Sequence, residues 1–289
     1  MSGTAISGAA REHLRGAYDL HIHTSPDVIA RKLTSNETVA QARAAGMAGV
    51  ALKSHVMSTA SAAAALNELW PDFRAVSCLV LNSQVGGINP WAAEAFGKMG
   101  GELLWFPTLD AENYVTWKRS TGANAPDRGA LRVTDESGAL LPAAAAVLDL
   151  AAKYDLTVGT GHLSPGESVV LVKEAAARGV KKIWVTHVTL PCCTMSVKQM
   201  KECVACGALI EFSYGHVVHK QFPLDDLLSG LRAIGAENAV LTTDSGQANA
   251  PFPVDVLGEA IDVLLNNGFS SAEVDVLLKA NPQKLLRRR

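Results

Sequence analysis

The amino-acid sequence predicts an α/β protein of the (β/α)8 TIM-like barrel type, and three observations support this fold class. Eight short apolar runs recur along the 289 residues, and a stretch with helical features follows each of them. Most of these runs are continuously apolar, which is typical of parallel strands buried on both faces. A strand followed by a helix, repeated eight times, is the pattern of a parallel sheet closed into a barrel. The predicted strands span residues 18–23, 49–55, 74–82, 102–107, 156–162, 182–187, 208–214 and 239–244.

The segments between the predicted strands carry helix-start and helix-stop signals. Thr34-Ser-Asn-Glu37 has the form of a capping box, and Gly46 stands where a glycine commonly ends a helix. Proline favours the first turn of a helix, and five prolines stand near predicted helix starts. They are Pro90, Pro142, Pro165, Pro223 and Pro253. An open doubly wound sheet is the alternative, but it usually has fewer strands, and no glycine-rich phosphate loop follows the first strand.

One segment, residues 108–141, interrupts the alternation of strands and helices. A loop of this length inside a compact domain is usually functional or disordered. Because the segment follows the fourth strand, it would lie at the C-terminal mouth of the barrel. We therefore expect a single domain over residues 1–289, with 108–141 as a lid or substrate-contacting loop; an irregular hairpin without function is the alternative.

The composition excludes several classes of protein. The 26 Lys and Arg residues nearly balance 28 Asp and Glu, whereas a nucleic-acid-binding domain normally carries a basic face. No run of about 18 apolar residues predicts a membrane span, and the N-terminus lacks the apolar core of a signal peptide. Five unevenly spaced cysteines do not resemble a disulfide framework. We expect a cytoplasmic protein with a small-molecule substrate and neither a nucleic-acid nor a membrane partner; homo-oligomerisation stays open.

Metal-ligating side chains gather at the predicted strand ends. Five of the eight histidines and one aspartate end a strand: His21, His23, His55, His162, His187 and Asp244. The C-terminal strand ends of a barrel converge on one mouth, where the active sites of this fold lie. Residues two apart on a strand point to the same side, so His21 and His23 would face inward together. Imidazole plus carboxylate is the usual ligand set of a catalytic zinc or related divalent ion, so the sequence predicts a metal site.

The motif Asp19-Leu-His21-Ile-His23, with Gly-His162, Thr-His187 and Thr-Asp244-Ser-Gly later in the chain, resembles the amidohydrolase superfamily. Members of that superfamily are metal-dependent hydrolases on a distorted (β/α)8 barrel. The resemblance implies that His21, His23 and His162 are metal ligands and that His187 is a further ligand or polarises a carbonyl group. It implies that Asp244 is both a ligand and the proton shuttle. Zinc is the expected ion, with manganese as the alternative, at one or two ions per chain.

The first two strands are also similar to those of PHP phosphoesterases. Asp19-Leu-His-Ile-His-Thr24 is followed by Gly-Val-Ala-Leu-Lys-Ser-His55, and on this interpretation His55 is a metal ligand. The sequence departs from the PHP pattern because Lys53-Ser54 replaces Thr-Asp, no Glu ends the third strand, and Ser245-Gly246 replaces Asp-x-His.

The amidohydrolase pattern has a gap as well. Many two-metal members carry a bridging carboxylated Lys or a Glu at the end of the fourth strand, where this chain has Trp105-Phe106-Pro107. Lys53 shares a face with His55 and could bridge two ions if carboxylated. It could equally bind an anionic substrate or form a salt bridge at the rim.

These residues predict hydrolysis of an amide, cyclic amide or lactone bond in a small anionic substrate. A divalent ion lowers the pKa of a bound water to about 7, Asp244 would accept its proton, and the ion or His187 would stabilise the oxyanion. The predicted catalytic residues are Asp244, His187 and Lys53, and the predicted substrate contacts are Arg31, Lys32, Lys53 and Tyr214. His216 and His219, beyond the seventh strand, fit poorly as ligands. The alternatives are a PHP-like phosphoesterase, a metal-dependent non-oxidative decarboxylase and a non-catalytic metal-binding barrel.

Overall fold

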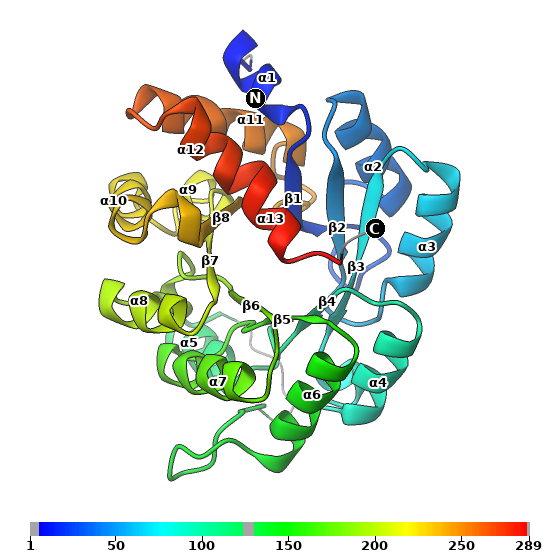
Figure 1. The fold of residues 1–289 in the computed structure, drawn as a ribbon, viewed down its shortest axis with the longest axis vertical. Coiled ribbons are helices and arrows are strands. Elements are labelled where there is room, and N and C mark those ends of the chain that lie inside the picture. Colours follow the sequence, from blue (N-terminus) through cyan, green and yellow to red (C-terminus); the bar gives the residue numbers. More distant parts are fainter. Residues whose placement is uncertain (1–5, 124–129, 288–289) are drawn as a thin grey trace.

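Eight parallel strands follow one another around the centre of the molecule, each paired with the next in chain order (Figure 1). The computed structural model describes residues 6–123 and 130–287. Between β8 and β1 the barrel closes through a bridge that pairs Ile22 with Ser245. The (β/α)8 prediction is therefore confirmed. The strands are β1 Tyr18–His23, β2 Gly49–Lys53, β3 Arg74–Val80, β4 Leu103–Trp105, β5 Thr157–Gly159, β6 Lys182–Val185, β7 Leu209–Ser213 and β8 Ala239–Thr242.

Most predicted strands extend beyond the observed ones at their C-terminal ends. His55, His162, His187 and Asp244 all lie in the loops directly after β2, β5, β6 and β8. His187 has a φ angle of 64° and Asp244 one of 48°, and neither left-handed conformation can continue an extended strand. The side chains keep their places at the barrel mouth, but loops hold them there.

Helices surround the barrel and start largely where the sequence indicates. Thr34 and Glu37 form the predicted capping box, and four prolines lie in the first turn of α4, α6, α7 and α11; Pro223 is instead the N-cap of α10. The helices are α1 Gly8–Leu14, α2 Ser35–Ala44, α3 Ala60–Leu69, α4 Pro90–Lys98, α5 Glu112–Ser120, α6 Pro142–Lys153, α7 Pro165–Ala177, α8 Val197–Ala205, α9 Gly215–Val218, α10 Leu224–Ile234, α11 Pro253–Asn266, α12 Ser271–Asp275 and α13 Asn281–Lys284. None of those in the described part of the chain has the length and apolar character needed to cross a bilayer.

Apolar side chains fill the barrel below the mouth. The rings of Trp105 and Trp184 meet edge to face at 4.9 Å, and Leu285 and Leu286, which follow α13, belong to the same buried cluster. The Thr157 hydroxyl, at the start of β5, donates to the carbonyl of Leu285. The C-terminal segment thus packs against the N-terminal end of the barrel, and the histidines of the predicted metal site lie at the opposite end.

The segment 108–141 contains a helix, α5, and two short bridges rather than irregular chain throughout. Residues 124–129 lie outside the described part of the chain. The Nδ2 group of Asn113 in α5 donates to the carbonyl oxygens of His162 at 3.1 Å and Cys192 at 2.8 Å. These bonds hold α5 against the loops after β5 and β6, and the lid function stays a prediction.

Candidate metal centre

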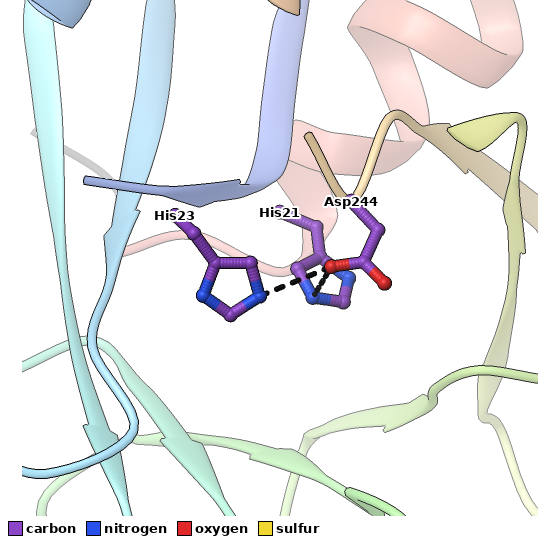
Figure 2. A group of neighbouring side chains, drawn as sticks. All are labelled: His21, His23 and Asp244. Carbon is purple, nitrogen blue, oxygen red and sulfur yellow. Dashed lines mark hydrogen bonds and ion pairs between the residues drawn. The ribbon is translucent and has the colours of Figure 1, made fainter. Parts of the chain in front are cut away.

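His21, His23 and Asp244 point toward one another at the open end of the barrel (Figure 2). The Oδ1 atom of Asp244 lies 2.9 Å from Nε2 of His21 and 3.1 Å from Nε2 of His23. The two histidines come from β1 and the carboxylate from the loop after β8, which are neighbours because the barrel closes between them. These three side chains offer ligand atoms close enough together to hold one ion.

His162 and His187 form a second pair of imidazoles beside this group. Their Nε2 atoms are 3.3 Å apart, and Nε2 of His187 is 3.9 Å from Oδ2 of Asp244. Two nitrogens on one tetrahedral zinc ion, at about 2.1 Å each, lie about 3.4 Å apart. The spacing of the His162 and His187 nitrogens therefore suits a shared ion.

Glu211 in β7 is a functional candidate that the sequence analysis missed. Its Oε1 accepts hydrogen bonds from Nδ1 of His21 at 2.7 Å and from the Thr242 hydroxyl at 2.8 Å. Its Oε2 accepts from the backbone N–H of His187 at 2.7 Å. The available signal was a single acid inside the apolar strand Leu209–Ser213, because a buried carboxylate needs polar partners.

His216 lies against the candidate metal site as a partner of Asp244, and that it fits poorly as a ligand stays a prediction. Its Nε2 lies 3.0 Å from Oδ2 of Asp244, and its Nδ1 lies 2.7 Å from the Thr189 hydroxyl. Helix α9 begins at Gly215, immediately after β7, and turns the chain back over the barrel mouth. Only glycine fits at position 215, because a β-carbon there would overlap the carbonyl oxygen of Thr243.

Lys53 is completely buried in the same cluster. Its Nζ lies 2.7 Å from Nε2 of His21 and 3.8 Å from the centre of the Trp105 ring. Burial lowers the pKa of Lys53 to about 8, although the charges of Asp244 and Glu211 oppose the shift. Lys53 thus lies at the His21 nitrogen that also contacts Asp244. Burial would lower the pKa of His21, but the charges of Asp244 and Glu211 raise it, so His21 would give up a proton to bind a metal ion through this nitrogen.

His55 lies at the edge of the cluster. Its Nδ1 is 2.8 Å from the Thr108 hydroxyl, and its ring stacks on that of His23 at 4.6 Å. Among the described residues, two groups offer ligand atoms within reach of one ion, and neither includes His55: His21, His23 and Asp244, and His21, His187 and Glu211. The interpretation as a PHP-type centre depends on His55 and gains no support from this position.

The electrostatic surroundings keep most of the imidazoles neutral. Burial holds the pKa values of His23, His55, His162 and His187 well below their usual range. Burial would also raise the pKa of Asp244, but the charge of His21 and hydrogen bonds from three imidazoles hold it well below its usual value. Neutral imidazole and ionised carboxylate are the protonation states that bind metal ions.

The residues present fit a divalent ion. The cluster combines nitrogen and carboxylate ligands, and the Lys53 ammonium group already lies where the carboxylates favour a cation. The Nδ1 atoms of His23, His162 and His187 are buried and have no hydrogen-bond partner. An ion in the cluster would bind the Nε2 atoms of these residues, which face one another and Asp244, so the unpaired Nδ1 atoms are not its ligands.

A cavity of about 430 Å³ opens onto the cluster. Its walls include Arg31, Tyr114, His216, His219, Gln221 and Gln247. Of the predicted substrate contacts, Arg31 lines the cavity and Lys53 lies beneath it. Lys32 and Tyr214 lie elsewhere: the Lys32 ammonium group lies over the Phe252 ring at 4.8 Å, and the Tyr214 hydroxyl donates to Glu259 at 3.0 Å.

Several solved structures share this fold. The probable dipeptidase PvdM from Pseudomonas aeruginosa has a TM-score of 0.63 at 10% identity, with 96% of each chain covered. An amidohydrolase from Pseudomonas aeruginosa has a TM-score of 0.55 at 13% identity, with 97% of this chain and 98% of that chain covered. The organophosphorus hydrolase from Deinococcus radiodurans has a TM-score of 0.62 at 14% identity, with 99% of this chain and all of that chain covered.

The fold and the sequence comparisons together define the relationship of this chain to known proteins. No match was found among the curated proteins. A family described as "family of unknown function (DUF6282)" matches residues 16–211, which is more than half of the chain and includes β1 to β6 and the start of β7. The structural neighbours are of the amidohydrolase type that the sequence resembles. The chain therefore belongs to the DUF6282 family of unknown function and has the fold of the amidohydrolase superfamily.

Proposed function

We propose that this protein is a metal-dependent hydrolase that cleaves an amide, cyclic amide or lactone bond in a small anionic substrate. One observation carries the proposal: the Asp244 carboxylate contacts three imidazoles, those of His21, His23 and His216, in the wall of an open cavity. A purely structural carboxylate would be expected in the core, whereas this one faces a space that can admit a substrate.

The ion would be held by His21, His23 and Asp244, with His162 and His187 available for the same or a second ion. A divalent ion at such a site supplies Lewis acidity and lowers the pKa of a water molecule to about 7. Zinc suits this set of nitrogen and carboxylate ligands, and manganese is the alternative.

Asp244 is the residue best placed to move protons. It is ionised at neutral pH, so it can accept a proton from the attacking water and return it to the leaving nitrogen or oxygen. The Nε2–H group of His216 donates to Oδ2, and the Thr189 hydroxyl donates to Nδ1 of His216, which fixes this tautomer. This arrangement orients the carboxylate toward the cavity.

His187 and Lys53 supply positive or polarising groups on the other side of Asp244. The backbone of His187 is held by Glu211, so its imidazole approaches the cluster in one orientation and can polarise a substrate carbonyl. Lys53 places a cation beneath the cavity floor, where it favours the developing oxyanion.

Metal analysis combined with an activity screen tests this proposal. Reconstituted protein should contain zinc or manganese and should hydrolyse at least one member of a panel of lactones, cyclic imides, amides and phosphoesters, with loss of activity on chelation. His23→Ala should lose the ion, whereas His13→Ala is the matched control, because His13 pairs with Asp275 at 2.8 Å away from the site. Less than about a tenth of an equivalent of metal after reconstitution would contradict the proposal.

A further inference from the structure

We propose that the free edge of the Arg31 guanidinium group is a binding subsite for a carboxylate group of an organic substrate. The inference rests on the proposed function in one respect: the carboxylate belongs to the molecule whose reacting bond lies at Asp244. It specifies that the anionic group of the proposed substrate is a carboxylate and that this group binds at Arg31.

Asp27 holds Arg31 by one edge of the guanidinium plane. Both Nε at 2.9 Å and Nη2 at 2.7 Å donate to the same oxygen, Oδ2 of Asp27. The other oxygen of Asp27 accepts from the backbone N–H of Val28 at 2.7 Å. The side chain of Asp27 is fully buried and that of Arg31 only 3% exposed, so the guanidinium plane has little freedom to move.

The pair with Asp27 does not use the N–H donors on the opposite edge of the guanidinium group. A guanidinium group has five N–H donors, and the pair with Asp27 uses only those on Nε and one on Nη2. Within residues 6–123 and 130–287, no side chain or carbonyl accepts a hydrogen bond from Nη1, and Arg31 lines the cavity. The edge formed by Nη1 and Nη2 presents two parallel N–H groups, which match the two oxygens of a carboxylate.

The loop that carries Arg31 is fastened to the loop that carries Asp244. Arg31 and Gln247 form an antiparallel bridge, and the backbone N–H of Lys32 donates to the carbonyl of Gly246 at 2.9 Å. The side-chain amide of Gln247 in turn donates to the carbonyl of Asp244 at 2.8 Å. The free edge of Arg31 is therefore at a fixed offset from the Asp244 carboxylate, as the positioning of a short substrate requires.

The rest of the cavity favours an organic carboxylate over a bare inorganic anion. Ile29, Leu109 and Leu190 give the wall apolar surface. Among the described lining residues, Arg31 is the only Lys or Arg and Asp244 the only acid. A monoanion with an apolar body matches this combination, whereas a phosphate dianion would find one Lys or Arg side chain among the described lining residues.

Calorimetric titration of the full-length protein with butyrate tests the subsite, with butyramide and inorganic phosphate as comparison probes. We expect butyrate to bind at least about tenfold more tightly than either probe. Arg31→Lys keeps the charge and removes the planar edge, so it should weaken butyrate binding at least about tenfold. Arg43→Gln is the matched control, because Arg43 pairs with Asp72 through the same two nitrogens on the surface and away from the cavity; it should leave binding unchanged.

The titrations are run on metal-loaded and on chelated protein, so that the outcome does not depend on the ion. Loss of butyrate binding on chelation with no effect of Arg31→Lys would assign the anion to the ion and overturn the subsite. Equal binding of butyramide, or tighter binding of phosphate, would overturn the carboxylate assignment. If Arg31→Lys does not fold, as judged by circular dichroism, the double variant Asp27→Asn/Arg31→Gln removes both buried charges together and should show the same loss. If the protein binds no metal, the proposed function is contradicted. Butyrate binding to the unchanged protein and to Arg31→Lys can still be compared in that case.

Discussion

The replacement Glu211→Gln removes one oxygen from a side chain in which both oxygens accept hydrogen bonds. Oε1 accepts from His21 and the Thr242 hydroxyl, and Oε2 accepts from the backbone N–H of His187. An amide group carries only one acceptor, so in either orientation its NH2 group faces at least one N–H or O–H donor. A charge-assisted bond is lost and a buried donor is left unpaired, which should cost about 2–4 kcal/mol of unfolding free energy.

The same replacement affects the metal centre through His21. Glu211 accepts from Nδ1–H of His21, so His21 would bind an ion through the lone pair of Nε2 once that atom has lost its proton. If the new amide donates to Nδ1 instead, the proton moves to Nε2 and that lone pair is lost. Loss of such a partner typically weakens metal affinity about 10–100-fold.

Two measurements on one preparation test this account. Thermal unfolding of Glu211→Gln should shift the midpoint downward by about 3–7 °C, and competition with a chelator should give the weaker zinc affinity. Glu259→Gln is the control, because Glu259 accepts a hydrogen bond from the Tyr214 hydroxyl and touches no candidate ligand. Unchanged zinc affinity in a Glu211→Gln protein that is folded would refute the role assigned to this carboxylate.

Three further predictions concern the same cluster. Asp244→Asn should lower kcat by about 10²–10⁴ while much of the metal is retained on the histidines; normal turnover with metal bound would remove Asp244 from the mechanism. Lys53→Met should retain at least one ion and lower turnover, as measured by metal analysis and kinetics on one sample, and full activity would exclude a catalytic role. Burial depresses the pKa values of four histidines in the folded state: His23, His55, His162 and His187. Protonation of these side chains below their ordinary pKa of 6.5 therefore favours the unfolded state. The free energy of unfolding should fall as the pH decreases through this value. Urea unfolding of metal-free protein between pH 8 and pH 5 measures this effect, and a flat profile would contradict the neutral assignment.

The sequence by itself determined the barrel and the residues at the centre of its site, His21, His23 and Asp244. Continuous apolar runs indicate strands that are buried on both faces. Eight such runs, alternating with helix starts, are compatible with few topologies other than a closed parallel sheet. Since parallel strands all end at one mouth, His21, His23 and Asp244 could be assigned to a single site without knowledge of any loop. His21 and His23 lie within β1, so strand register sets their positions, whereas Asp244 lies two residues beyond β8 and is placed by the loop there.

Only the tertiary structure decided which residues support and surround that site. Glu211 lies within an apolar strand and His216 in the short helix α9, and neither position indicates a partner until β7, β8 and β1 are placed side by side. Arg31 and Lys32 are adjacent cations in the sequence, yet one lines the cavity and the other lies over Phe252. The physical reason is that strand ends are fixed by a periodic backbone pattern, whereas the direction of a loop side chain depends on hydrogen bonds and close contacts with segments distant in the chain.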